Sequence, residues 1–247
     1  MSVRTIAAIV ATTLAFLQPT SVRALVSNGM KGSTEALQSQ IEQTIGRPLA
    51  IQFGSTASLK KRIEAGEAFD VTIITTEAID DLISQGKLTR ASRAEVGRSE
   101  LGIGIRAGAP KPDIRDAAAL KKALVAIPSV TYPQDGASRG TIEKMFERLG
   151  IAADMKPKII LAPGSAAATE SVAAGRAAMV LTLFSEIVPT PGAEILGPLP
   201  GDFRSDIRFA AAASAVSKNA DAVKTLIAFL SGPQAAPILK SNGIEPR

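Results

Sequence analysis

The sequence of 247 residues contains no histidine, no cysteine and no tryptophan, and aromatic residues make up only 4% of it. Without cysteine there can be no disulfide bond, no thiolate nucleophile and no thiolate metal cluster. Without histidine there can be no Ser-His-Asp triad and no histidine-ligated zinc. Any acid–base chemistry therefore falls to Asp, Glu, Lys or the single tyrosine, Tyr132. We expect neither a cofactor nor a bound metal.

Charge of one sign is never concentrated in the chain. The 28 basic and 23 acidic residues give a formal charge of +5, and they alternate in sign along segments such as SLKKRIEAGE. This mixture is typical of a solvated surface. No basic run is interleaved with aromatic residues, so we expect no nucleic-acid partner. The small positive excess suits a protein that gathers a small anion.

The first residues differ from the rest of the chain. Arg4 precedes the uncharged run IAAIVATTLAFL at residues 6–17, which has the length of a signal sequence and is too short to span a bilayer. We interpret residues 1–21 as a signal peptide; a buried helix is the alternative, and the cleavage site stays open. Because there is no cysteine for a lipid anchor, we expect a soluble periplasmic protein.

Strand-length apolar runs alternate with helical patterns through most of the chain, which predicts an α/β fold with mostly parallel sheets. The Pro-rich stretch APKPDI interrupts this alternation, which then resumes. The expected strands include residues 22–27, 49–53 and 70–75 before the break, and SVTYP, KIILAP and AAMVLTLF after it. A long apolar strand, IRFAAAASAVS, and two helices close the chain.

Four junctions between a strand and a helix share one chemistry. They are SNGMKGST, FGSTAS, DGASRGT and PGSAAAT, and each offers Gly for close approach with Ser or Thr hydroxyls. Such junctions gather at the carboxyl edge of a parallel sheet, where helix N-termini present N–H groups to anions. Each junction alone could be an ordinary helix cap. Two before the break and two after it predict two lobes that close on one anion.

Arg139 is an unusual residue for the start of a helix. A helix N-terminus carries partial positive charge, so local stability favours Asp or Glu there. Arg139 could point into solvent, or it could meet a bound anion. The sequence alone leaves both interpretations open.

Several longer segments resemble the molybdate-binding (ModA-like) family of periplasmic solute-binding proteins. They are FGSTASLKKRIEAGEAFDVTIIT, GASRGTIEKMFERLGI, SVAAGRAAMVLTLFSEIV and the C-terminal segment that begins FAAAASAVSKNADAV. The resemblance covers essentially everything after residue 21. It implies a two-lobed type II periplasmic binding protein fold. Lobe 1 would hold residues 22–100 plus 207–247 and lobe 2 residues 101–206, with ELGIGIRAG and IRFAAAASAVS crossing between them.

The resemblance also implies a ligand site. Relatives hold molybdate with serine hydroxyls, backbone N–H groups in the four turns and a tyrosine hydroxyl, but the tyrosine position is Leu183 here. The first turn, SNGMKGS, departs from the family pattern. Its hydrogen-bond donor to the ligand is therefore open among Asn28, Lys31 and Ser33. The expected ligand-binding residues are Asn28, Lys31, Ser33, Ser55, Thr56, Ser138, Arg139 and Ser165.

Lys31 and Arg139 stand where molybdate-binding relatives have small residues. Because a guanidinium matches a carboxylate in bidentate geometry, they favour an organic di- or tricarboxylate over a bare oxyanion. The resemblance implies a non-catalytic monomer that delivers its anion to the permease of an ABC importer. An isomerase that acts on aconitate is the alternative, because some proteins similar to this family have that activity. Lys31 would then be the base and Arg139 a clamp, with Tyr132 or Glu186 nearby.

Overall fold

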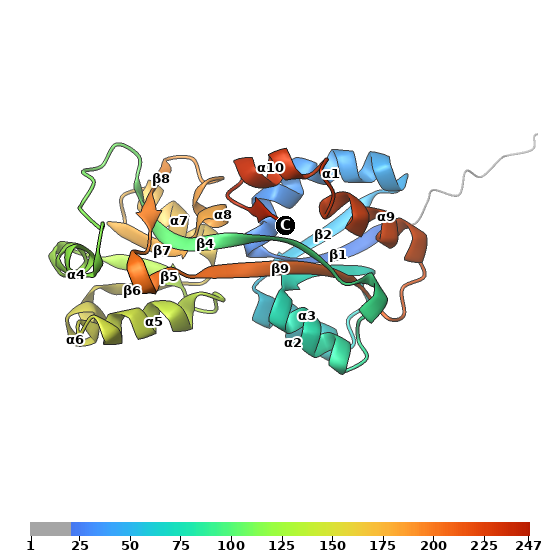
Figure 1. The fold of residues 1–247 in the computed structure, drawn as a ribbon, viewed down its shortest axis with the longest axis horizontal. Helices are drawn as coiled ribbons and strands as arrows, with labels where there is room; N and C mark the ends of the chain where they lie inside the picture. The colour runs from blue at the N-terminus through green and yellow to red at the C-terminus, as the bar shows by residue number, and fades with distance from the viewer. Residues whose placement is uncertain (1–20) are drawn as a thin grey trace, which may run out of the picture.

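A computed structural model describes residues 21–247, and it contains two α/β bodies joined by two long strands (Figure 1). The predicted signal peptide lies outside the described residues except for Ser21. Within the described part, no helix combines the length and the apolar character needed to cross a membrane. The predicted α/β class is confirmed.

The strands form one continuous hydrogen-bonded path in the order β2-β1-β3-β9-β4-β7-β5-β6, with β8 and β10 attached to β4. In the described chain they are β1 Val22–Ser27, β2 Leu49–Gly54, β3 Val71–Thr75, β4 Ala94–Arg106, β5 Val130–Pro133, β6 Ile159–Ala162, β7 Met179–Leu183, β8 Ala193–Pro198, β9 Asp206–Ala213 and β10 Glu245–Pro246.

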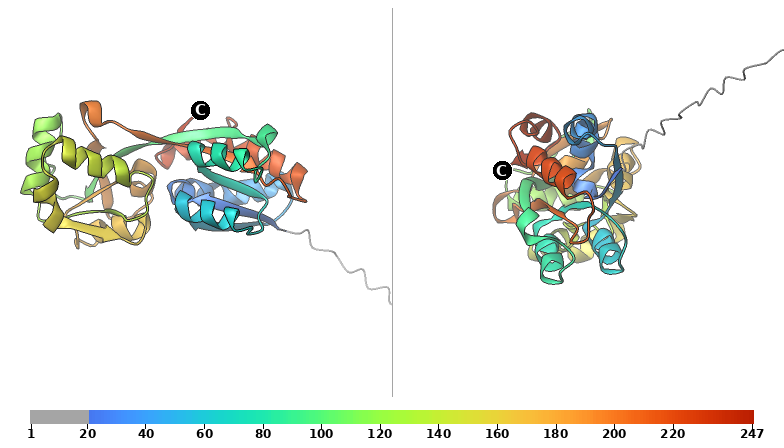
Figure 2. Two further views of the ribbon diagram at one scale, coloured as in Figure 1. Left: turned by 90° about the horizontal axis from the view of Figure 1, so that it is seen from below. Right: turned by 90° about the vertical axis from the view of Figure 1, so that its right-hand side faces the viewer.

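Strand β4 belongs to both bodies. Its residues 94–100 pair antiparallel with β9, and its residues 101–104 pair antiparallel with β7. In the body where β4 pairs with β9, β1 runs parallel to β2 and β3. In the body where β4 pairs with β7, β5 runs parallel to β6 and β7. Figure 2 shows the bodies side by side, connected by β4 and β9 along one edge. We propose on this basis the lobe division at residues 100/101 and 206/207.

Helices cover the faces of both sheets (Figure 1). The longer ones are α1 Lys31–Ile45, α2 Thr56–Glu64, α3 Thr76–Ser84, α4 Ala117–Ala126, α5 Arg139–Arg148, α7 Ser165–Ala173 and α9 Ala220–Leu230. The short ones are α6 Ala152–Met155, α8 Phe184–Ile187, α10 Ala236–Ser241 and the 3-10 turns η1 Asn28–Met30, η2 Arg90–Ser92, η3 Lys156–Lys158 and η4 Gly201–Phe203.

Local sequence explains which face of helix α1 is buried and where the helix ends. Leu37 and Ile41 lie one turn apart and are both buried, so one face of the helix packs on the sheet. The helix ends at Gly46, whose left-handed backbone (φ 65°) costs glycine little. Strand β9 contributes Ala211 and Ala212 to the interior at 0% exposure, so small side chains let neighbouring layers approach closely.

The sequence pattern does not predict strand β8. It lies in the Pro- and Gly-rich stretch VPTPGAEILGPLPGD, yet residues 193–198 pair antiparallel with β4. Proline is tolerated in such a position because an edge strand needs only part of its hydrogen-bonding capacity. The strand completes the lobe that contains β5, β6 and β7.

Candidate functional site

The four strand–helix turns meet at one cavity between the two groups of strands, which we call the inner cavity. Its lining residues are Ser27, Asn28, Gly29, Ser55, Thr56, Pro133, Asp135, Gly136, Ala137, Ser138, Ser165, Leu183, Glu186 and Phe209. The volume of this cavity is about 20 Å³. In this form the cavity has room for a compact ion and not for a large organic acid.

The first two turns bring hydroxyl groups together. Thr56 Oγ1 lies 3.5 Å from Ser27 Oγ, and Ser55 Oγ accepts a hydrogen bond of 3.1 Å from the Ser58 backbone N–H. Ser55 therefore caps helix α2 with a lone pair and keeps its O–H available as a donor. Sequence reasoning missed Ser27, because the last residue of a strand gives no sign that its side chain faces a ligand.

The other two turns bring helix starts to the same place. Ser138 is the residue before α5, Ser165 is the first residue of α7, and both are at most 5% exposed. The first N–H groups of a helix lack partners within it and carry partial positive charge. The N-termini of α2, α5 and α7 therefore all present donors near the inner cavity.

Gly29 allows the first turn to pack against the wall of the cavity. A Cβ atom added to Gly29 would lie 2.5 Å from Phe209 Cζ and 3.1 Å from Leu183 Cδ1. Both neighbours line the cavity, and Leu183 does so at the position where relatives were expected to carry a tyrosine. The wall is apolar at this point, so the tyrosine hydroxyl has no counterpart in Leu183.

The structure does not bring all the predicted residues together. Asn28, Ser55, Thr56, Ser138 and Ser165 line the inner cavity. Lys31 and Ser33 do not line it, and neither does Arg139. A role in ligand binding for these three residues stays a prediction, and the inner cavity does not support it.

Lys31 and Ser33 both belong to helix α1. Lys31 Nζ lies 3.9 Å from Glu35 Oε1 and 5.7 Å from the centre of the Phe53 ring, on the exposed side of the helix. Ser33 is 1% exposed, and its Oγ has no hydrogen-bond partner among the described residues. One side chain thus points to the rim and the other into the packed interior.

Arg139 is held by its own helix and by the turn that precedes it. Its Nε donates to Glu143 Oε1 at 2.8 Å and its Nη1 to the Gln134 carbonyl at 2.6 Å. The hydrogen bond from Arg139 to Glu143 raises the pKa of the arginine. Glu143, one turn into the helix, therefore supplies the negative charge that the sequence interpretation assigned to a ligand.

Two carboxylates and no Lys or Arg are found among the described residues that line the inner cavity. Asp135 is exposed, whereas the Glu186 carboxylate accepts hydrogen bonds from the Thr182 hydroxyl and, at 3.4 Å, from the Leu183 backbone N–H. Burial raises the pKa of Glu186, and the hydrogen bonds from Thr182, Ser165 and Leu183 oppose that shift. The donors for an anion are therefore all neutral.

A second cavity adjoins the first, and we call it the outer cavity. Its lining residues are Asn28, Lys31, Gly32, Glu35, Phe53, Gly164, Ser165, Ala166, Glu170, Ser185, Glu186, Pro189, Thr190 and Pro191. The volume of the outer cavity is about 310 Å³. Asn28, Ser165 and Glu186 line both cavities, so these residues form the partition between them.

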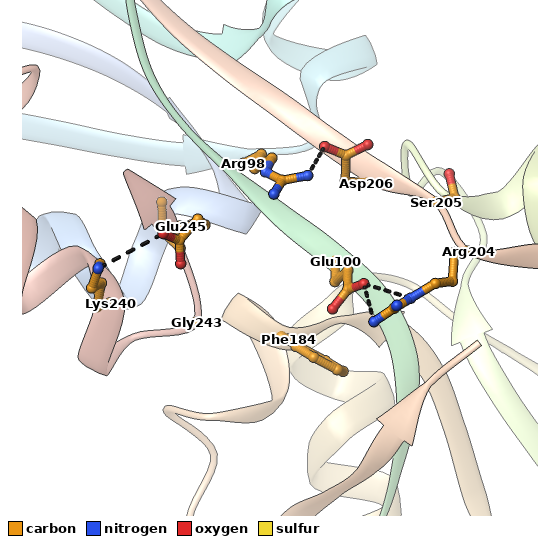
Figure 3. Close-up of a pocket in the computed structure, with 10 residues that line it drawn as sticks. Arg98, Glu100, Phe184, Arg204, Ser205, Asp206, Lys240, Gly243 and Glu245 are labelled. Carbon is orange, nitrogen blue, oxygen red and sulfur yellow. Dashed lines mark hydrogen bonds and ion pairs between the residues drawn. The ribbon is translucent and has the colours of Figure 1, made fainter. Parts of the chain in front are cut away.

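A third cavity, of about 620 Å³ by the same measure, lies against the crossing strands β4 and β9 (Figure 3). Its three cations each pair with a carboxylate: Arg98 with Asp206 at 3.3 Å, Arg204 with Glu100 at 3.1 Å and Lys240 with Glu245 at 3.8 Å. No charge is left uncompensated among these pairs. This cavity therefore lacks the feature that would draw an anion, although it is larger than the inner one.

Comparison with known proteins identifies the family. Residues 22–245 match the family described as bacterial extracellular solute-binding protein. The chain belongs to this family. It is one of the solute-binding proteins of ABC importers, and the predicted resemblance to ModA-like type II periplasmic binding proteins is confirmed.

Two curated relatives span nearly the whole chain. The chain is 27% identical to an aconitate isomerase from Pseudomonas sp, over 95% of this chain and 92% of that protein. It is 24% identical to the molybdate-binding protein ModA of Azotobacter vinelandii, over 92% of this chain and 90% of that protein. The structure of the A. vinelandii periplasmic molybdate-binding protein superposes with a TM-score of 0.77 at 19% identity, covering 92% of this chain and all of that one. The fold is thus the one expected.

Proposed function

We propose that this protein is the ligand-binding component of an ABC importer and that it binds a small anion in the inner cavity. The observation that carries this proposal is the meeting of four turns, two from each side of the crossing strands, at one cavity of hydroxyl groups and helix N-termini. Such neutral donors bind anions because their dipoles point at the ligand. Family membership supports the transport role.

The size and charge of the cavity favour a compact oxyanion over a di- or tricarboxylate. The sequence argument for an organic acid rested on Lys31 and Arg139, and neither side chain lines the inner cavity. A compact tetrahedral anion would take hydrogen bonds from Ser55 and Thr56 on one side and from the starts of α5 and α7 on the other. We therefore replace the organic-acid preference by a preference for oxyanions.

The ligand would also link the two lobes. Because its donors come from both sides of β4 and β9, bound anion stabilises the arrangement in which the lobes are close. We propose that the protein acts as a monomer in the periplasm after removal of residues 1–21, and that the closed form docks on the importer's permease.

One observation favours a second candidate, an isomerase that acts on aconitate. The 27% identity to an aconitate isomerase extends over 95% of the chain. In this case the substrate would occupy the outer cavity, with Lys31 at its rim, and Glu186 would be the base because burial raises its pKa. Arg139 would take no part.

Isothermal titration of the protein with molybdate, sulfate, phosphate, citrate and aconitate tests the proposal. We expect at least one oxyanion to bind and the Thr56→Val variant to weaken it by about 1.5–3 kcal/mol, because a hydrogen bond to a charged group is lost. Ser58→Ala is the matched control, since Ser58 is exposed on the same helix. Tight binding of aconitate alone, with turnover, would favour the isomerase.

A further inference from the structure

The inner cavity presents a problem for an anion-binding site, because two carboxylates line it and no cation does so among the described residues. Asp135 is exposed, so water screens its charge. Glu186 lies on helix α8 in the partition between the inner and outer cavities. An anion in the inner cavity and an ionised Glu186 would both be negative, so they would repel each other.

The hydrogen bonds of Glu186 all come from neutral groups. Thr182 and the Leu183 N–H both donate to Oε2, and no Lys or Arg nitrogen within the described chain forms an ion pair with this carboxylate. Burial raises the pKa of Glu186 despite these donors. The carboxyl group is therefore prepared to hold a proton when a further negative charge arrives.

The charged groups around α8 do not neutralise it. Lys31, Glu35 and Glu170 line the outer cavity, and the first two pair with each other at 3.9 Å. On the neighbouring strands, Glu100 of β4 pairs with Arg204, and Glu194 of β8 pairs with Lys111 at 3.4 Å. The remaining charged residues of β4 are Glu95, Arg98 and Arg106, of which Glu95 and Arg98 pair with Arg93 and Asp206. Arg106 is exposed at the end of β4.

We propose that one proton is held between Glu186 and the bound anion, and that this makes Glu186 a specificity-determining residue for oxyanions that bring their own proton. The proposal rests on the proposed anion-binding function. A proton between the two oxygens converts repulsion into a charge-assisted O–H···O⁻ hydrogen bond. Without that proton the contact is between two like charges.

The chemistry of the ligand decides where the proton comes from. Phosphomonoesters have a second pKa of about 6, and inorganic phosphate keeps its second proton to a somewhat higher pH, so near neutral pH both readily supply it. Sulfate and molybdate are anions of stronger acids, so the proton must be taken from solution onto Glu186. We therefore assign the site to hydrogen-phosphate-like anions, including phosphonates and phosphomonoesters small enough to enter. Any substituent on the phosphorus would extend into the outer cavity.

The test is titration calorimetry of the full protein with phosphate and with sulfate between about pH 5.5 and about pH 8.5, in buffers of different ionisation enthalpy. For sulfate we expect uptake of about one proton and, toward the alkaline end, an affinity that falls about tenfold for each pH unit. For phosphate we expect smaller proton uptake and tighter binding near neutral pH.

Two variants separate Glu186 from its surroundings. Glu186→Gln replaces the carboxyl group by an amide donor, so sulfate binding should lose its pH dependence. Glu170→Gln makes the same change of charge at an exposed residue of the outer cavity and should keep the wild-type pH dependence. If Glu186→Gln fails to fold, the proton uptake measured with the wild-type protein still decides the question.

The outcomes distinguish the inference from the function on which it rests. Sulfate affinity that is independent of pH, without proton uptake, would overturn the role of Glu186 and leave the anion site intact. A pH dependence that persists in Glu186→Gln would do the same. If no oxyanion binds at any pH, or if Thr56→Val binds as well as the wild type, the inner cavity is not the anion site and both proposals fall.

Discussion

Arg139 Nε lies 2.8 Å from Glu143 Oε1, one turn further along helix α5. Both side chains are more than one-third exposed, so the pair contributes little to stability. We predict that Arg139→Ala leaves both the melting temperature and the oxyanion affinity almost unchanged, because water screens this surface ion pair. Thermal melts and titration calorimetry check the two effects. A tenfold loss of oxyanion affinity in this variant would show that Arg139 contacts the ligand.

Removing the hydroxyl group of Ser33 is expected to stabilise the protein. Its buried hydroxyl has no partner among the described residues, and a buried polar group left unsatisfied costs about 1–3 kcal/mol. We expect Ser33→Ala to keep ligand affinity and to raise the melting temperature, by roughly 2–4 °C for each kcal/mol gained. Weaker ligand binding in this variant would show that the first turn uses Ser33 after all.

Gly29 tests the packing of the inner cavity. Alanine there would place its Cβ 2.5 Å from Phe209 Cζ, so the turn or the ring must move. We predict that Gly29→Ala destabilises the protein by about 1–3 kcal/mol and weakens oxyanion binding, because the first turn shifts. Adding Phe209→Leu should restore part of the stability. Gly66→Ala is a poor control because its φ is 87°, whereas Gly140→Ala meets nothing within 4 Å and should cost little.

The sequence carried much of this information. Alternating strand and helix patterns predicted the α/β fold, and the shared Gly, Ser and Thr chemistry of four turns predicted where they would meet. Five of the eight predicted ligand residues line the inner cavity. Turn chemistry is local, and the carboxyl edge of a parallel sheet gathers its turns in one place, so this part of the site follows from general rules.

The positions of the two predicted cations outside the inner cavity have a physical cause. Lys31 and Arg139 each have a glutamate four residues later, Glu35 and Glu143, and both pairs form in the structure. That spacing was visible in the sequence, and it would have weakened the argument for two ligand-binding cations. The importance of Glu186 could not be read from sequence, because its desolvation depends on contacts between α8, α7 and the first turn.

Glu186 should also affect the stability of the empty protein in a pH-dependent way. Because its pKa is raised on folding, folding favours the protonated form, and the carboxyl group becomes increasingly unfavourable as pH rises past its unfolded pKa. We predict that Glu186→Gln melts at a higher temperature than the wild type at alkaline pH and that the difference shrinks in acid. A difference that is the same at every pH would show that Glu186 is already ionised without cost.

The most direct measurement is a crystal structure with arsenate, a phosphate-like oxyanion whose arsenic atom can be located by its anomalous scattering. The account predicts one strong arsenic peak in the inner cavity. Its oxygens should lie within hydrogen-bonding distance of Thr56 from one lobe, of the N-terminus of α5 or α7 from the other, and of Glu186. An arsenic peak against the crossing strands beside Arg98 and Arg204, with none in the inner cavity, would contradict it.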